Sequence, residues 1–410
     1  MISLAKAQEI LKIDYKRAVT YALERNREIQ QIKREILSLE DLYRAQKWER
    51  FSPRLSAYAD KEGIGLFSEV LLLDFGNRLA RIRSARIQVQ IKKELLKEFE
   101  RQVKIRLMEL FRDLALAEKL AEVSREEMAV AYVRYDRERE RLERGLSDRV
   151  KVAEWYNTYR RFRKTLMEAQ REYNDTLFEI KRFMGFPVDE PVEIIYSDIL
   201  SFEVPENLTI EPNYLIANIY NNYLIRSKEL EISYFESRAT EEKRIFYPEL
   251  TAYFDFRNSY KNMDRFRGEG NIIFNIPLFD GNSSFYRYKS FIEIKRSVEI
   301  EKKDIHQKLM RFSLRAPYLW DELIADYQSA VAFDDWAQEN LDLSRSNYEL
   351  ELAFDLGYAM STKTESERQV MRAKFEIILF LMRLYNLMGM DPLLALEKQH
   401  PFFTQRTGEI

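Results

Sequence analysis

The chain has 410 residues, with 66 basic and 68 acidic side chains, a formal net charge of −2, two histidines and no cysteine. The balanced charge lacks the basic excess expected of a general nucleic-acid-binding protein, and the absence of cysteine excludes disulfides, thiolate metal sites and catalytic thiols. Glycine (11) and proline (10) are scarce, whereas charged residues make up 33% and hydrophobic residues 46% of the chain, which predicts few turns, long elements and a large core.

Helical periodicity dominates the chain. Apolar residues recur every three or four positions from Leu96 to Ala121 and again from Tyr159 to Met184, which is typical of coiled-coil seams. Further apolar residues, such as Met108 and Phe111, lie off the first seam and predict that this helix packs on more than one side. Breaker residues limit the expected helices to 14–51, 77–143, 146–184, 213–246, 283–350 and 357–388.

The two halves of the chain repeat. Residues 51–60 align without gaps on residues 246–255, and the same offset places Asn26 on Asn221. Each half therefore contains a helix, a β-hairpin, a long helix and a further helix. We expect a first repeat over 1–190 with its hairpin at 53–76, a proline-rich linker over 191–212, a second repeat over 213–390 with its hairpin at 248–281, and a C-terminal tail over 391–410.

The second hairpin alternates apolar and polar residues, as strands do. Its strands are about 10 residues long, which suffices to cross a bilayer when tilted, and aromatic residues concentrate around it, as they do at lipid interfaces. We expect one face to contact lipid, formed by Leu250, Ala252, Phe254, Phe256, Ile272, Phe274, Ile276 and Leu278.

The first hairpin is shorter and contains a charge. The same alternation puts Glu69 on the lipid-facing side with Phe67 and Leu71, where a charge costs about 2–4 kcal/mol near the middle of a membrane. The sequences Gly63-Ile-Gly65 and Gly268-Glu-Gly270 lack the spacing of a phosphate-binding loop and predict hairpin turns. Four strands cannot close a barrel, and open sheet edges are not tolerated in lipid, so membrane-spanning strands would require several chains.

Taken together, several motifs resemble those of TolC-like outer-membrane efflux proteins, over about residues 11–390. The resemblance rests on their order, spacing and duplication. The motifs are the opening at 11–29, the strand entries at Pro53 and Pro248, the strand exits at Gly76-Asn77 and Gly281-Asn282, the turn at 144–148, and the repeat ends at 183–185 and 387–389.

The resemblance implies a mainly α fold with a small β part. Long antiparallel coiled-coil helices would form an α-barrel in the periplasm, and the two hairpins of each of three chains would form an intermolecular 12-stranded β-barrel in the bacterial outer membrane. It further implies a passive exit duct of a tripartite efflux or type I secretion system, docked to a periplasmic adaptor (membrane fusion) protein and an inner-membrane transporter. No enzymatic activity, cofactor or metal is expected, and a signal peptide is presumed removed.

Two groups of residues are candidate sites. Tyr348, Glu351 and Asp355 lie near the expected tunnel end of the second helical hairpin, where rings of acids and tyrosines could constrict the mouth and select by charge. Of these, only Tyr348 matches a gating position of the family, and the alternative is a solvated helix end. The segment Gly145-Leu146-Ser147 predicts a helix–helix turn, and the resemblance implies that it docks the adaptor.

The competing interpretation is a soluble antiparallel coiled-coil scaffold with small β-insertions. It accounts for the seams, the high charge and an N-terminus without the pattern of a signal peptide. It does not account for two alternating hairpins at equivalent positions of the repeats. An enzyme is the third alternative, because the sequence shows no arrangement of a nucleophile, metal ligands or a phosphate-binding loop.

Overall fold

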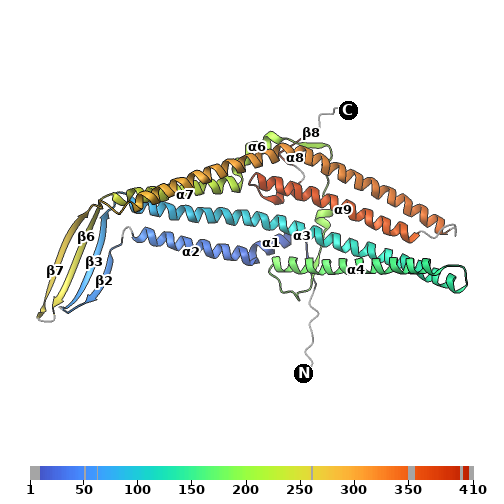
Figure 1. Cartoon of the computed structure of the whole chain (residues 1–410), viewed down its shortest axis with the longest axis horizontal. Coiled ribbons are helices and arrows are strands. Elements are labelled where there is room, and N and C mark those ends of the chain that lie inside the picture. The colour runs from blue at the N-terminus through green and yellow to red at the C-terminus, as the bar shows by residue number, and fades with distance from the viewer. Residues whose placement is uncertain are drawn as a thin grey trace, which may run out of the picture. The chain divides into compact units, whose positions relative to one another are not determined.

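The computed structural model describes residues 10–49, 52–61, 63–259, 262–349, 356–397 and 400–405. Long helices make up most of the chain (Figure 1). The α-helices are α1 (Tyr15–Arg25), α2 (Arg27–Glu49), α3 (Asn77–Glu143), α4 (Arg149–Phe183), α5 (Ser197–Leu200), α6 (Pro212–Asn218), α7 (Tyr223–Lys243), α8 (Ser283–Glu349) and α9 (Leu356–Leu387). Short 3-10 helices are η1 (Ile219–Asn221), η2 (Arg244–Phe246) and η3 (Pro392–Leu396).

Within the described residues the strands form three sheets. A parallel pair joins β1 (Leu11–Ile13) to β4 (Val192–Ile194), and an antiparallel pair joins β5 (Leu208–Ile210) to β8 (Phe403–Gln405). The third sheet has four antiparallel strands in the order β2-β3-β6-β7. Its strands are β2 (Arg54–Ala59), β3 (Gly63–Leu73), β6 (Glu249–Ser259) and β7 (Asn262–Asn275).

The chain divides into two compact units, and each combines segments from both halves of the sequence. Unit 1 comprises Met1–Ile29, Phe99–Ile219 and Leu309–Ile410, and unit 2 comprises Gln30–Glu98 and Tyr220–Lys308. Unit 1 therefore holds α1, α4 and α9 with the two small sheets, and unit 2 holds most of α2, α7 and the four-stranded sheet. Both α3 and α8 contribute residues to each unit.

Asparagine caps break two of the expected helices. The segment expected as one helix over 14–51 ends at Asn26, whose side chain accepts hydrogen bonds from the backbone N–H of Glu28 (2.9 Å) and Ile29 (3.3 Å). In the second repeat, Asn222 accepts from Leu224 N (2.9 Å) and begins α7. The counterpart of Asn26 is therefore Asn222 and not Asn221, because a side chain must stand just before the first turn to cap it.

Carboxylates at equivalent positions begin the two longest helices. In unit 2, Asp74 accepts from Arg78 N at 2.6 Å and Asp280 accepts from Ser284 N at 2.8 Å, so each acid satisfies a free N–H of the first turn. Gly76, two residues after Asp74, has φ +92°, and its carbonyl oxygen accepts a hydrogen bond from Arg244 Nη1 at 2.8 Å. A side chain at Gly76 would need left-handed geometry and would also meet the Arg244 guanidinium.

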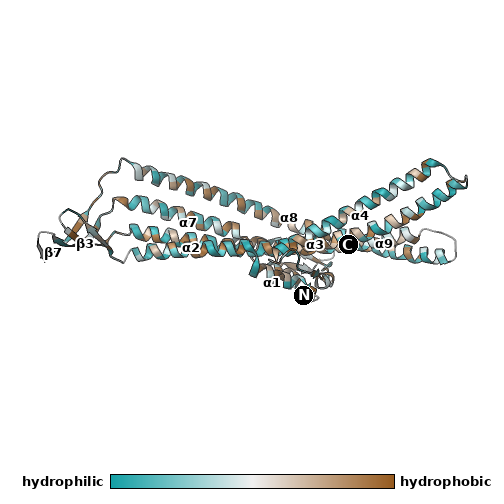
Figure 2. Cartoon of the chain, turned by 90° about the horizontal axis from the view of Figure 1, so that it is seen from below, coloured by the Kyte–Doolittle hydropathy of each residue, from teal (hydrophilic) through white to brown (hydrophobic). Residues whose placement is uncertain are grey.

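The core of unit 1 is formed where α3 packs on more than one side, as the off-seam residues predicted. Leu107 and Leu114 of the seam and Met108 and Phe111 beside it are all fully buried. On α9 a continuous run, residues 377–379, is fully buried as well. Tyr15 of α1 packs edge-to-face on Phe111 and donates to the carbonyl oxygen of Lys104 at 2.8 Å. Figure 2 shows hydrophobic and hydrophilic residues interspersed along the long helices.

Candidate functional site

The four-stranded sheet of unit 2 has one apolar face. In the β6–β7 register Leu250 lies opposite Phe274 and Ala252 lies opposite Ile272, and directly paired residues project to the same side of a sheet. The six predicted lipid-facing residues that lie within the strands therefore share one face. Large apolar side chains on it are exposed within the chain, with Phe254 at 45% and Phe274 at 57%.

Two of the eight predicted lipid-facing residues lie outside the sheet. The strand β7 ends at Asn275, so Ile276 and Leu278 belong to the segment that leads to α8. Both are exposed, Leu278 at 87%. The alternation of apolar and polar residues continues past the end of the strand, but in the described part of the chain no partner strand pairs with these two residues.

The register of β3 corrects the expected position of Glu69. Glu69 lies opposite Tyr253 and Phe67 lies opposite Asp255, so both project to the polar face. The apolar face receives Leu66 and Val70 instead, and a bulge between Leu71 and Leu73 then brings Leu73 opposite Leu250. A strand carries alternate residues on opposite faces, so an error of one residue in the assumed phase reverses every side chain.

Gly65, Gly268 and Gly270 lie inside strands, so the prediction of hairpin turns was wrong for these residues. Gly63 is the first residue of β3. Gly268 and Gly270 lie within β7, opposite Phe256 and Phe254. A Cβ at Gly268 would lie 3.0 Å from the Phe256 ring, and one at Gly65 would lie 2.3 Å from the Tyr58 ring. Each aromatic ring therefore covers a glycine on the neighbouring strand, which pins the register of the sheet.

A polar network crosses three strands on the opposite face. The hydroxyl of Tyr58 donates to Asp255 Oδ1 at 2.7 Å and accepts from Arg257 Nε at 3.2 Å. The Arg257 guanidinium also donates from Nη2 to Asp60 Oδ2 at 2.7 Å and stacks over the Tyr58 ring at 5.4 Å. These polar groups satisfy one another, so this face carries a connected hydrogen-bonded network while the other face is apolar.

Among the residues that the structure describes, both edges of the sheet are open. The strand order β2-β3-β6-β7 leaves β2 and β7 with one neighbour each. The outward N–H and C=O groups of these two strands are therefore available to pair with another strand, which is the usual hazard of an edge strand in a folded protein.

The turn at residues 145–147 is a compact helix–helix connection of unit 1. Gly145 has φ +72° and its N–H donates to Leu142 O at 2.9 Å, while Leu146 N donates to Arg141 O at 2.8 Å. The hydroxyl of Ser147 donates to Glu138 Oε2 at 2.6 Å and, as the largest contribution, holds the pKa of Glu138 below its usual value. Leu146 is 66% exposed.

Beneath this turn, four tyrosines fasten α3 to α4. Tyr132 packs on Tyr159 with ring centroids 5.5 Å apart, and Tyr135 packs on Tyr156 at 5.3 Å. The three residues of the turn are thus presented at the end of a helix pair that its own aromatic rings hold together.

Of the candidate constriction, the structure describes only Tyr348, which is exposed near the end of α8. Glu351 and Asp355 lie outside the described residues. The structure therefore does not bring the three together, and the constriction stays a prediction.

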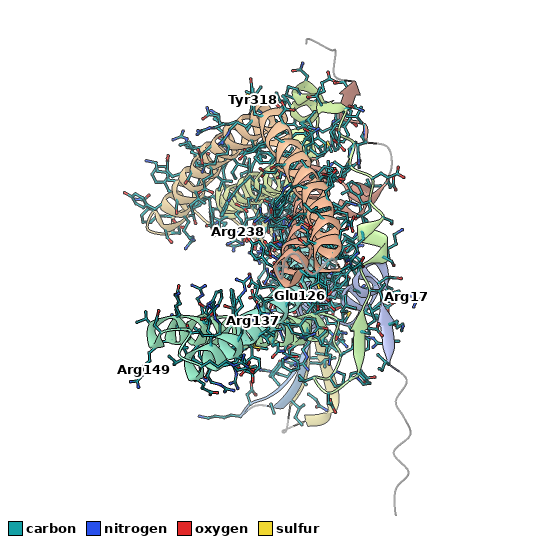
Figure 3. All side chains as sticks on the ribbon, turned by 90° about the vertical axis from the view of Figure 1, so that its right-hand side faces the viewer. Arg17, Glu126, Arg137, Arg149, Arg238 and Tyr318 are labelled. Carbon is teal, nitrogen blue, oxygen red and sulfur yellow. The ribbon has the colours of Figure 1, made fainter. Side chains whose placement is uncertain are left out.

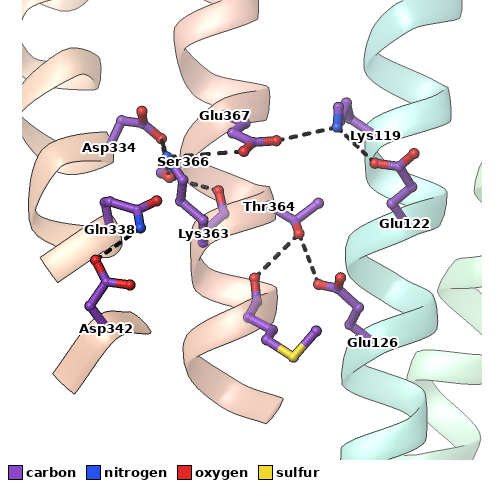
Figure 4. Close-up of polar contacts among 11 residues, drawn as sticks. Lys119, Glu122, Glu126, Asp334, Gln338, Asp342, Lys363, Thr364, Ser366 and Glu367 are labelled. Atoms are coloured by element: carbon purple, nitrogen blue, oxygen red, sulfur yellow. Dashed lines mark hydrogen bonds and ion pairs between the residues drawn. The ribbon is translucent and has the colours of Figure 1, made fainter. Parts of the chain in front are cut away.

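A polar ladder between α3, α9 and α8 in unit 1 was not found from the sequence (Figure 4). Thr364 Oγ1 donates to Glu126 Oε2 at 2.9 Å, and Lys119 Nζ lies 3.3 Å from Glu367 Oε2. On the other side of α9, Lys363 Nζ lies 2.7 Å from Asp334 Oδ1. Burial raises the pKa of Glu126, with the Thr364 hydrogen bond opposing that rise. Charged residues at helical spacing are typical of a solvated helix surface, and only tertiary packing brings these ones into pairs.

The described part of the chain contains neither a membrane-spanning helix nor a metal-binding cluster. No helix there contains a stretch apolar enough to cross a bilayer. Among the same residues, no group of histidine, aspartate and glutamate side chains is arranged to hold a metal ion.

The chain has no match among family models or curated protein sequences, but solved structures resemble it over almost its whole length. A membrane protein from Pseudomonas aeruginosa has a TM-score of 0.73 at 16% identity, covering 96% of this chain and 94% of that one. The outer membrane protein VceC from Vibrio cholerae has a TM-score of 0.68 at 13% identity, covering 92% and 96%. The CmeC outer membrane channel from Campylobacter jejuni has a TM-score of 0.70 at 12% identity, covering 92% and 85%.

These similarities show that the fold is TolC-like, as the motifs predicted. The expected fold class, mainly helical with long antiparallel helices and four strands in two hairpins, is confirmed.

Proposed function

We propose that this chain forms a homotrimeric channel-tunnel of the bacterial outer membrane, the passive exit duct of a tripartite efflux or type I secretion system. The observation that carries the proposal is the four-stranded sheet. It has one apolar face that the chain leaves exposed, one networked polar face, and two open edges.

The two faces have the polarity that a barrel wall requires. A transmembrane strand alternates lipid-facing apolar residues with polar residues that face the lumen. Here Phe254, Phe274 and Ile272 would face lipid, while the network of Tyr58, Asp255 and Arg257 would face water. Because Glu69 lies on the polar face, its carboxylate would not face lipid, in contrast to what the alternation in the sequence predicted.

A trimer would satisfy the open edges of the sheet. Exposed backbone groups cannot remain unpaired in the hydrocarbon region. If β7 of one chain pairs with β2 of the next, three chains of four strands each close a sheet of twelve strands, and every edge is satisfied.

The helical part would form the periplasmic tunnel and dock its partners. The turn Gly145-Leu146-Ser147 presents an exposed leucine, and there is open space beyond Gly145 for an approaching chain. We therefore assign this turn as the docking point for a periplasmic adaptor protein, which would link the duct to an inner-membrane transporter. Neighbours in the fold such as CmeC are described as outer membrane channels.

Single-channel conductance in a planar bilayer tests the proposal. The detergent-extracted protein is added to the bilayer, and its mass is measured by light scattering. Discrete conductance steps from a particle of three chains are expected. A monomer or dimer that neither conducts nor binds lipid vesicles would overturn the proposal and favour a coiled-coil scaffold.

The same recording tests the constriction at the end of α8. If Tyr348 narrows the mouth, Tyr348→Ala raises the conductance of each step. The matched variant Tyr286→Ala, at an exposed position near the start of the same helix, leaves the conductance unchanged. Equal conductance of Tyr348→Ala and the unmodified protein would remove Tyr348 from the mouth.

A further inference from the structure

Four helices of unit 1 form a layer in the order α4, α3, α9, α8 (Figure 1). Ala121 of α3 packs with Leu166 and Ala169 of α4. On its other side, α3 pairs with α9 through Arg112 and Glu376 at 2.8 Å. The rings of Trp320 on α8 and Phe380 on α9 stack with centroids 6.3 Å apart. The helices α4 and α8 are therefore the two edges of the layer.

Contacts across the layer determine which residues lie at the same height, that is, at the same position along the helix axes. The packing of Ala121 with Leu166 and of Tyr132 with Tyr159 places Glu126 of α3 level with residues 159–166 of α4. Glu126 in turn accepts from Thr364 of α9. Lys363, the next residue of α9, pairs with Asp334 of α8. Residues near 161 on one edge thus lie level with residues near 334 on the other, and the two edge helices run in opposite directions.

The outer side of α4 carries a basic stripe, defined here as Arg149, Arg160, Arg163 and Arg171. These exposed residues recur at helical spacing together with the exposed side chains of Tyr156 (45%) and Met167 (52%). Among the described residues, none of the four guanidinium groups has a carboxylate within ion-pair distance. The nearest part of the core packs on the opposite side of α4, through Leu166 and Ala169.

The outer side of α8 carries an acidic stripe, defined here as Glu322, Asp335 and Glu339. These exposed carboxylates likewise have no cationic partner in the described part of the chain. They recur at helical spacing with exposed Tyr318 (76%), Trp336 (52%) and Leu343 (61%). Figure 3 shows Arg149 of α4 and Tyr318 of α8 well separated at the periphery, so the two stripes do not meet within one chain.

We infer that the acidic stripe of one copy of this chain packs on the basic stripe of the next. A rotation about an axis parallel to the helices does not change the position of a residue along that axis. Residues at the same position along the axis, on opposite edges of the layer, therefore meet when copies are arranged in a ring. Arg163 then faces Asp335, Arg160 faces Glu339, and Met167 and Tyr156 meet the apolar side chains of α8. Opposite charges at matched heights set the order and register of the copies. The inference rests on the proposed trimer and names the helical contact that assembles it.

Chemical cross-linking tests the contact directly, because the chain has no cysteine of its own. We combine Met167→Cys on α4 with Ala332→Cys on α8 in one chain and add a short bismaleimide. Both positions are exposed and lie at similar heights, so cross-linked dimers and trimers are expected on a denaturing gel. The control pairs Met167→Cys with Ser346→Cys, which is 14 residues nearer the end of α8, about 21 Å further along the helix, and should yield monomers.

Charge reversal tests whether the charges drive the contact. In detergent, Arg160→Glu with Arg163→Glu is expected to lower the assembly constant more than about tenfold, because like charges then face each other across every interface. Adding Asp335→Arg and Glu339→Arg to the same chain should restore assembly. The control Glu154→Arg with Glu172→Arg reverses two exposed charges of α4 outside the basic stripe and should leave assembly unchanged. Circular dichroism checks that each variant is folded.

The outcomes separate this inference from the proposed function. A trimer that conducts, that is insensitive to reversal of the basic stripe and that gives no cross-link between positions 167 and 332 would overturn the inference and leave the channel intact. An unmodified protein that is monomeric and does not conduct would overturn both. The inference would be supported by cross-linking between positions 167 and 332, together with assembly that is lost when the basic stripe is reversed and restored when the acidic stripe is reversed as well.

Discussion

Similar apolar side chains are buried in the core of unit 1 and exposed on the sheet of unit 2. In unit 1, Phe111 and Ile378 are fully buried by other helices of the same chain. In unit 2, Ile272 and Phe274 of the sheet are 62% and 57% exposed. Large exposed apolar surfaces mark places where something outside the chain completes the fold. Unit 1 is thus stabilised from within, whereas under the proposed function the sheet would depend on lipid and on neighbouring strands.

The largest effect on stability is expected in the core of unit 1. Phe111→Ala removes a fully buried ring that packs on Tyr15 and Tyr196, and such changes cost about 3–5 kcal/mol. Phe274→Ala makes the same chemical change in the sheet, at a side chain that is 57% exposed, and should cost far less. Denaturant unfolding in detergent measures both. Equal losses would contradict the contrast between a buried core and an exposed sheet.

The two faces of the sheet can be compared at adjacent residues. Ile272 lies on the apolar face opposite Ala252, and Ile273 lies on the polar face opposite Thr251. An arginine that faces lipid near the bilayer centre costs about 2–4 kcal/mol, so Ile272→Arg should destabilise the protein folded in vesicles by that amount. Ile273→Arg should cost much less. If Ile273→Arg is the more damaging variant in urea titrations, the assignment of the faces is reversed.

The helix caps of the second repeat offer a smaller contrast. Asn222 is 6% exposed and caps α7, whereas the side chain of Asn221 accepts from Arg226 Nη2 at 2.8 Å at the surface. Loss of an asparagine cap costs about 1 kcal/mol, so Asn222→Ala should lower the free energy of unfolding by that amount. Asn221→Ala serves as the matched control and should change it by a few tenths, about the size of a surface substitution.

A further contrast concerns pH at the C-terminal segment of unit 1. His400 Nδ1 lies 2.9 Å from the hydroxyl of Tyr385 and its ring stacks on Phe402, and burial lowers the pKa of His400 to about 4. The unfolded chain then binds more protons between pH 6.5 and 4, so the stability contributed by His400 is complete above pH 6.5 and is lost as the pH falls to 4.

The pH dependence is isolated by comparison with His400→Gln. Burial raises the pKa of Glu126, so its contribution has the opposite sign and grows as the pH falls. The melting temperature of each protein is measured from pH 8 to pH 4. The melting temperature of the unmodified protein should fall more steeply than that of His400→Gln below pH 6.5. Parallel curves would show that His400 does not contribute.

Periodic patterns carried much of the prediction. The limits of α3 agree with the expected helix at 77–143, because an asparagine after a glycine marks its start and a glycine-containing turn marks its end. The off-seam residues Met108 and Phe111 correctly predicted packing on several sides. The resemblance of the motifs, in their order, spacing and duplication, correctly implied a TolC-like fold.

Predictions that depend on phase or pairing were less successful. The phase of β3 was wrong because Leu71 to Leu73 contain a bulge that alternation cannot reveal. Gly268 and Gly270 were assigned to a turn because glycine is common there, yet they sit under Phe256 and Phe254. That signal, a glycine facing an aromatic residue on the partner strand, becomes visible only once the register is known.

The sequence by itself determined which segments are helical and which are extended, because those properties follow from local spacing, caps and breakers. It also determined that the halves repeat. Only the tertiary structure decided which residues of β3 lie on the apolar face, which charges of α3 pair with α9, and which charges of α4 and α8 have no partner among the described residues. Those outcomes depend on the residues that packing brings together across long stretches of chain, and no local pattern records them.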